Sequence, residues 1–194
     1  MKKITGVLLS VLFATNLFAQ SNIWKTDPAH TSVRFAVTHM VINEVEGKFT
    51  SFNGTMTSSK PDFTDAQIEF TVEVKSISTD NEMRDNHLKS ADFFNADSFP
   101  QMKFRSTSIK KISDKKYLLE GDLTIRDVTK RVTFDVTYGG TIKDSYGNTR
   151  AGFKATARIN RLDYHLNWNK TMEAGAVVSA DVDVIINTEF IQQK

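Results

Sequence analysis

Apolar and polar residues alternate with a period of two through most of the chain. The clearest case runs from Ala66 to Lys75, where apolar residues occupy the even positions and polar residues the odd ones. Because successive side chains of a strand point to opposite faces, this pattern predicts a strand that buries one face and exposes the other. The same pattern, weaker in the second and fourth cases, predicts strands over eight segments: 33–41, 49–56, 66–75, 102–108, 117–125, 132–138, 151–159 and 178–186.

Short turn sequences separate several of these strands, at residues 113–115, 139–140 and 144–148, and they favour hairpins between antiparallel neighbours. The connection after the third strand differs. Thr79 and Glu82 have the spacing of a capping box, which predicts a short helix between strands three and four. Eight such strands can form a two-sheet sandwich or a closed barrel, and closure removes the edge strands. We therefore predict an all-β fold, an eight-stranded antiparallel β-barrel.

The interior of an eight-stranded barrel is either filled by side chains or holds one ligand. Many of the inward positions are Phe, Val or Ile, but glycine and alanine occur among them at positions 121, 151, 155, 157 and 180. Small residues leave room for a ligand, or they fit the taper of a filled core. The periodicity alone leaves both alternatives open.

The N-terminus has the pattern of a secretory signal peptide. Lys2 and Lys3 precede an apolar stretch that begins at Val7, and Ala19 supplies the small residue needed before the cleaved bond. The apolar stretch is too short to span a bilayer. We expect a signal peptide over 1–19, cleaved near Ala19, a barrel domain over 22–191, and a periplasmic or secreted protein with no transmembrane segment in the mature chain.

The composition excludes several functional classes. The chain has no cysteine, which rules out disulfides, thiolate metal sites and a cysteine nucleophile. Lys and Arg number 25 against 23 Asp and Glu, and loss of the two N-terminal lysines balances them, so no nucleic-acid partner is expected. The spacing of His30 and His39 is not that of a common metal site, and we predict no metal and no cofactor. No catalytic sequence motif occurs, and we predict that the protein is not an enzyme.

Several short motifs gain meaning when they are taken together. They are WKTDPAHTSVRF at 24–35, VEGKF at 45–49, FNG at 52–54, RDNHLKSADFF at 84–94, GDLTI at 121–125, VTK at 128–130, and NR at 160–161. Together they resemble the YceI family of exported, lipocalin-like proteins, and the resemblance extends from Trp24 to about Glu189. Asp127 departs from the family pattern, which has glycine at that position, and this indicates a turn of different shape.

The resemblance implies an eight-stranded, lipocalin-like barrel in the bacterial periplasm. It also implies that the lumen binds a polyisoprenoid or quinone-like lipid, and it makes a homodimer a candidate assembly. Two alternatives stay open. One is a ligand-free stress or interaction barrel with a filled lumen. The other is a small periplasmic enzyme that uses Arg84, Asp85 and His87 at the barrel mouth.

Residues of the lumen and its mouth are the candidates for contact with a lipid: Phe35, Val37, His39, Phe49, Arg84, His87, Leu88, Phe93, Phe94, Phe104 and Trp168. On a helix the side chains of Arg84 and His87 are close enough to contact each other, and they would bind the polar headgroup of a lipid. Each group also has a structural interpretation. Arg84 and Asp85 would pair within the connector, His39 would be a core histidine, the phenylalanines would plug the barrel end, and Trp168 would anchor an interface.

Overall fold

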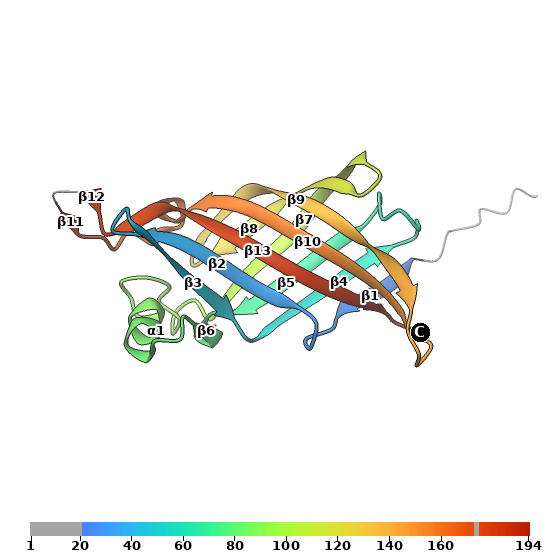
Figure 1. Ribbon diagram of the computed structural model, residues 1–194, viewed down its shortest axis with the longest axis horizontal. Coiled ribbons are helices and arrows are strands. Elements are labelled where there is room, and N and C mark those ends of the chain that lie inside the picture. The colour runs from blue at the N-terminus through green and yellow to red at the C-terminus, as the bar shows by residue number, and fades with distance from the viewer. Residues whose placement is uncertain (1–20, 173–174) are drawn as a thin grey trace, which may run out of the picture.

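The computed structural model describes residues 21–172 and 175–194, so the expected signal peptide lies outside the described residues (Figure 1). The barrel wall has eight positions, each occupied by one strand or by two strands end to end. Neighbouring positions pair antiparallel in chain order, and the pairing of β1 with β13 closes the ring. The prediction of an eight-stranded closed barrel is confirmed. The strands of the ring are β1 (Asn22–Thr26), β4 (Phe52–Ser58), β5 (Gln67–Glu73), β7 (Gln101–Ser113), β8 (Lys116–Ile125), β9 (Val128–Lys143), β10 (Thr149–Asn160) and β13 (Val178–Gln192).

The first three strand positions of the barrel are each built from two pieces. β2 (Ser32–His39) continues β1 along β13, β3 (Asn43–Phe49) pairs with β2 and runs on into β4, and β6 (Ile77–Ser78) follows β5 after the 3-10 turn η1 (Val74–Ser76). The expected first strand, 33–41, therefore corresponds to β2 alone. β1 was missed because five residues are too few to establish an alternating pattern.

The helix α1 (Glu82–Lys89) lies between the third and fourth strand positions, as predicted, and covers one end of the barrel (Figure 1). Its N-cap is Asn81, whose side chain accepts a hydrogen bond from the Arg84 backbone N–H at 3.0 Å. Thr79 is not the cap, because its hydroxyl bonds the side chains of Asp85 and Arg84 instead. Among the described residues no helix is long and apolar enough to cross a membrane.

The two ends of the barrel differ. At the α1 end lie the 3-10 turn η2 (Arg161–Tyr164) and the small hairpin of β11 (Thr171–Met172) and β12 (Gly175–Ala176) (Figure 1). A buried cluster there joins Phe93, Ile125, Tyr164 and Leu166. A second cluster fills the opposite end and consists of Trp24, Met56, Phe63, Ala66, Ala151 and Phe190. The core of the molecule is therefore the barrel interior.

The turn between β8 and β9 consists of Arg126 and Asp127, and whether it differs from the turn of the family stays a prediction. Arg126 adopts the left-handed conformation with φ of 55°, and Asp127 follows it with its carboxylate 3.2 Å from His165. The Arg126 guanidinium donates to the backbone carbonyls of Phe93 and His165. The turn thereby ties the loop after α1 to the segment after η2.

Aromatic rings lie directly against glycines inside the barrel, and Gly121 gives the sharpest prediction. A Cβ atom at this position would lie 2.3 Å from Phe104 Cζ and 2.6 Å from the backbone oxygen of Arg105. Because the backbone cannot retreat, Gly121→Ala is expected to lower the free energy of unfolding by about 2 kcal/mol. Gly152→Ala is the matched control, since a Cβ there meets nothing within 4 Å. Urea denaturation of both variants measures the difference, and equal stabilities would contradict the packing argument.

Candidate ligand-binding site

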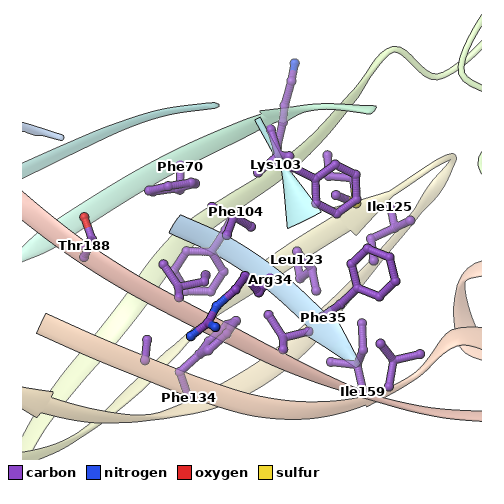
Figure 2. A pocket seen from close by; sticks show the side chains of 18 of the residues that line it. Arg34, Phe35, Phe70, Lys103, Phe104, Leu123, Ile125, Phe134, Ile159 and Thr188 are labelled. Atoms are coloured by element: carbon purple, nitrogen blue, oxygen red, sulfur yellow. The ribbon is translucent and has the colours of Figure 1, made fainter. Parts of the chain in front are cut away.

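A continuous cavity of about 210 Å³ occupies the barrel interior, so side chains do not fill the lumen completely. Its wall is almost wholly apolar, and residues from opposite sides of the barrel, including Phe35, Phe104 and Phe134, converge on it (Figure 2). The volume lies somewhat below the roughly 300–1,000 Å³ of typical ligand pockets. A slender single-chain molecule suits such a space better than a bulky ring system.

Residues of β2 and β13 form part of the cavity wall. The inward residues of these two strands, such as Phe35 and Val184, are paired across the sheet and are only half-buried. On the facing wall, Leu119, Phe134 and Val136 are fully buried. All five residues line the cavity, so both walls contribute to it.

Phe63 closes the end of the cavity that lies opposite α1. Its ring is 2% exposed and packs against Trp24, Tyr138 and Phe153, with ring centroids 5.5, 5.7 and 5.3 Å away. The loop that carries it is held by Asp65, whose carboxylate accepts hydrogen bonds from the side chains and backbone of residues 58–60. Burial alone would raise the pKa of Asp65, but these hydrogen bonds outweigh it and hold that pKa well below its usual range.

Seven of the candidate lipid-contact residues lie in the cavity wall: Phe35, Val37, Phe49, Leu88, Phe93, Phe94 and Phe104. They come from β2, β3, α1, the loop after α1 and β7. This placement follows from strand parity for the strand residues, because inward positions of a barrel strand alternate with outward ones. Their contact with a lipid stays a prediction.

The ionisable candidates on the helix do not line the cavity. Arg84 donates to the hydroxyl and the carbonyl of Thr79 at 2.7 and 2.8 Å, and Asp85 accepts from the backbone N–H and hydroxyl of the same residue at 2.8 and 2.6 Å. His87 does not meet Arg84, and its Nε2 lies 2.9 Å from the Asp92 carboxylate instead. All three ionisable side chains are therefore hydrogen-bonded within the connector itself.

The other two candidates also lie outside the cavity wall. His39 is half-buried and ends β2, paired with Asn43 on β3 and Val178 on β13, which places it beyond the end of the lumen. Trp168 is half-buried and packs against the buried cluster at the α1 end, with its ring centroid 5.0 Å from that of His87 and 5.3 Å from that of Phe93. Strand parity alone therefore does not decide which residues meet the cavity, because the position along the strand matters as well.

Arg161 is a buried, charged residue of the cavity wall, and the sequence reasoning did not select it. It is 4% exposed and follows directly after β10. A signal for it existed, because the inward positions of that strand are odd, from Ala151 to Ile159, and Arg161 continues the series. A charged residue at the next inward position of an apolar face is unusual enough to mark a site.

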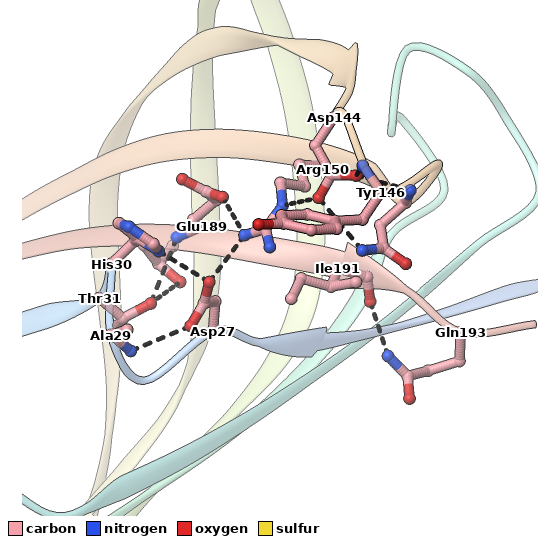
Figure 3. A network of polar contacts seen from close by, with 12 residues as sticks. Asp27, Ala29, His30, Thr31, Asp144, Tyr146, Arg150, Glu189, Ile191 and Gln193 are labelled. Atoms are coloured by element: carbon pink, nitrogen blue, oxygen red, sulfur yellow. Dashed lines mark hydrogen bonds and ion pairs between the residues drawn. The ribbon is translucent and has the colours of Figure 1, made fainter.

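A polar network lies outside the cavity, where β1, β13 and the β9–β10 turn meet (Figure 3). Arg150 donates to Asp27, Asp144 and Glu189 over 2.7, 2.6 and 2.5 Å. The hydrogen bonds from His30 and then from Arg150 lower the pKa of Asp27 to about 2, and Asp27 in turn raises the pKa of His30. Ligand atoms of Asp27, His30 and Glu189 lie within 4.8 Å of one another, as in a metal site. The Arg150 guanidinium already supplies a positive charge to the carboxylates of Asp27 and Glu189.

The closed antiparallel barrel with an apolar lumen defines a lipocalin-like protein. The YceI-like domain matches residues 24–190, and the chain belongs to this family. A UPF0312 protein of Staphylococcus aureus strain MSSA476 is 37% identical over 166 residues, which are 84% of this chain and 94% of that protein.

Solved structures show the same fold. The YCEI protein of Campylobacter jejuni superimposes with a TM-score of 0.71 at 29% identity, over 81% of this chain and 90% of that one. BcnA of Burkholderia cenocepacia has a TM-score of 0.75 at 21% identity, over 84% and 98%. A polyisoprenoid binding domain from Saccharophagus degradans has a TM-score of 0.65 at 11% identity, over 88% and 98%, and this likeness concerns the fold alone.

Proposed function

We propose that the protein is an exported carrier that sequesters a long, apolar, isoprenoid-type lipid in the barrel lumen. The single observation that carries the proposal is the continuous apolar cavity in the barrel interior. Each methylene group transferred from water into such a space contributes about 0.8 kcal/mol, so an apolar wall binds a long chain well without specific polar contacts. The polyisoprenoid-binding activity of the Saccharophagus degradans domain, which has the same fold, supports this choice of ligand.

Two alternatives are less well supported. A ligand-free barrel would have a lumen filled by side chains, and the cavity of about 210 Å³ argues against it. An enzyme built on Arg84, Asp85 and His87 would need these groups at the cavity, whereas Thr79 and Asp92 occupy them. Membership in the YceI-like family also favours a binding protein over an enzyme. The periplasmic location and the homodimer remain predictions of this proposal.

Extraction of the protein from its own source tests the proposal most directly. Native mass spectrometry of protein purified from the periplasm should show a mass increment, and solvent extraction should release an isoprenoid. Purified apoprotein should also bind added prenyl lipid, which quenching of tryptophan fluorescence measures. A protein that carries no lipid and ignores added prenyl lipid would rule out the carrier function.

A cavity-filling substitution gives a second test within one strand. Val184 lines the cavity on β13, so Val184→Trp should occupy the space and weaken binding of a C20 prenyl alcohol at least ~10-fold, because the chain loses buried methylene contacts. Ile185→Trp is the matched control, since Ile185 has the opposite strand parity and does not line the cavity. Isothermal titration calorimetry of both variants measures the effect, and equal affinities would place the ligand elsewhere.

A further inference from the structure

The turn between β2 and β3 exposes three consecutive apolar side chains, those of Met40, Val41 and Ile42, at the α1 end of the barrel (Figure 1). Val41 is 62% exposed and Ile42 is 87% exposed. Met83 on α1 and Leu162 in η2 are further exposed apolar residues at this end. A single exposed apolar residue is ordinary, but a run of three on a projecting tip is unfavourable in water and indicates a function.

The backbone of this turn is unsuited to the residues that form it. The Ile42 N–H donates to the His39 carbonyl at 3.3 Å, and Met40 and Val41 between them are left-handed, with φ of 50° and 64°. Hairpin turns with two such residues favour Asn-Gly, and a β-branched residue such as valine rarely adopts this conformation. The turn therefore presents apolar side chains at the expense of local backbone energy, as segments with a function do.

The turn adjoins the wall of the cavity. His39 at its start pairs with Val178 on β13, and the Met40 N–H donates to the Val177 carbonyl at 2.8 Å. Val178 and Val182 both line the cavity, and the register of β13 against β2 shifts between them. The exposed tip thus lies next to the place where the pairing of β2 with β13 is interrupted.

The size and the charge of the tip favour a lipid bilayer over a protein as its partner. A standard protein interface takes about 20–30 residues from each side, and a projecting turn of three residues falls far short of that number. Apolar side chains on a small projection can instead insert between lipid headgroups, where their burial supplies the binding energy. The nearest charged residue along the chain is the exposed Glu44, so this binding does not depend on anionic lipid.

We propose that the turn over residues 40–42 inserts into the surface of a lipid bilayer, and that the protein exchanges its cargo with the bilayer at this end of the barrel. The inference rests on the proposed carrier function. A long apolar chain is poorly soluble in water, because its transfer from a bilayer exposes every methylene group. Contact between the bilayer and the cavity end spares the chain that passage.

A triple variant, Met40→Asn with Val41→Gly and Ile42→Thr, tests the insertion without harming the fold, because Asn-Gly suits the backbone of the turn. Wild-type protein should co-sediment with phosphatidylcholine vesicles, and the triple variant should bind them at least ~10-fold more weakly. Its melting temperature should be no lower than that of the wild type. Ile112→Ser is the matched control, since Ile112 is 53% exposed on β7 beside the β7–β8 turn, at the opposite end. It should bind vesicles like the wild type.

Three outcomes of the sedimentation experiment would overturn the inference. They are a wild-type protein that ignores the vesicles, a folded triple variant that binds them as well as the wild type, and binding that disappears in high salt, which would indicate attraction between charges. A triple variant that loses self-association instead of vesicle binding would identify a second copy of the chain as the partner.

Transfer of geranylgeraniol, a C20 prenyl alcohol, separates this inference from the carrier function. The triple variant should bind the alcohol with unchanged affinity in calorimetry but take it up from phosphatidylcholine vesicles at least ~10-fold more slowly. Solvent extraction of protein separated from the vesicles at successive times measures the uptake. Equal uptake rates would overturn the docking and leave the carrier function intact. A wild-type protein that does not bind geranylgeraniol would overturn the carrier function and the exchange of cargo with it.

Discussion

Replacement of Arg150 by methionine is expected to lower the melting temperature at pH 7 by about 10 °C, with little change in lipid binding. The guanidinium is 18% exposed and lies among three carboxylates, those of Asp27, Asp144 and Glu189. Removal of one partner from a partly buried ion network leaves the remaining charges uncompensated, which is far more damaging than removal of a whole network. The three carboxylates belong to three segments, so their repulsion opens the seam where β1 meets β13.

The loss of melting temperature in the Arg150→Met variant should depend on pH, and it should be larger at higher pH. In the wild type the folded-state pKa of Asp27, at about 2, lies below its ordinary value of 3.8, and the pKa of Asp144 is lowered as well. A depressed carboxylate pKa stabilises the fold above the unfolded pKa, and this contribution disappears as the pH falls through the folded one. The difference in melting temperature between wild type and variant should therefore be largest at pH 7 and shrink between pH 4 and pH 2.

Arg158→Met serves as the control for the Arg150 substitution. Arg158 makes a bidentate pair with Asp183 on the outer face of the barrel, where its side chain is 67% exposed. Exposed ion pairs contribute little, so its melting temperature should change by no more than ~2 °C. Scanning calorimetry at several pH values compares the two variants. Similar losses in both would mean that the network at Arg150 has no special role in closing the barrel.

The closed barrel could be predicted from sequence because alternation is a local property that a long strand repeats many times. Segments such as 66–75 and 151–159 carry five apolar residues each at alternate positions, and the structure places 67–73 on β5 and all of 151–159 on β10. β1 was not predicted because it is short and because its place in the barrel depends on pairing with β13 at the far end of the chain. Non-local pairing leaves no mark on a short segment, whereas turn chemistry and period-two patterns do.

The candidate site was predictable only in part, for a related reason. Parity identifies which side chains point inward, as for Phe35, but it does not say where an interior is empty, since that depends on the sizes of residues from several strands. The helix residues Arg84 and His87 illustrate the other limit. Ionisable residues near a barrel mouth suggest a headgroup site, yet their nearest partners, Thr79 and Asp92, lie only five residues away in sequence. Arg161 could have been found by continuing the inward series of its strand.

Replacement of Phe63 by alanine is expected to lower the free energy of unfolding by about 3–5 kcal/mol and to lengthen the lumen. The ring is buried, contacts three other aromatic rings and lines the end of the cavity. Its loss removes buried apolar surface and leaves a void, because the loop held by Asp65 cannot collapse onto the barrel. The new space adjoins the existing cavity, so the affinity for a C35 prenyl chain should rise relative to that for a C20 chain.

Phe99→Ala separates this effect from the general loss of an aromatic residue. Phe99 is half-buried at the α1 end, 5.6 Å below the Arg126 guanidinium, and does not line the cavity. Its replacement should lower stability by no more than ~1 kcal/mol, the scale of an exposed cation–π contact, and leave chain-length preference unchanged. Urea denaturation gives the stabilities and competition between the two prenyl chains gives the preference. A Phe63→Ala protein that is destabilised but keeps the wild-type preference would show that the chain does not extend to this end, because a chain that reached Phe63 would meet the space its ring vacates.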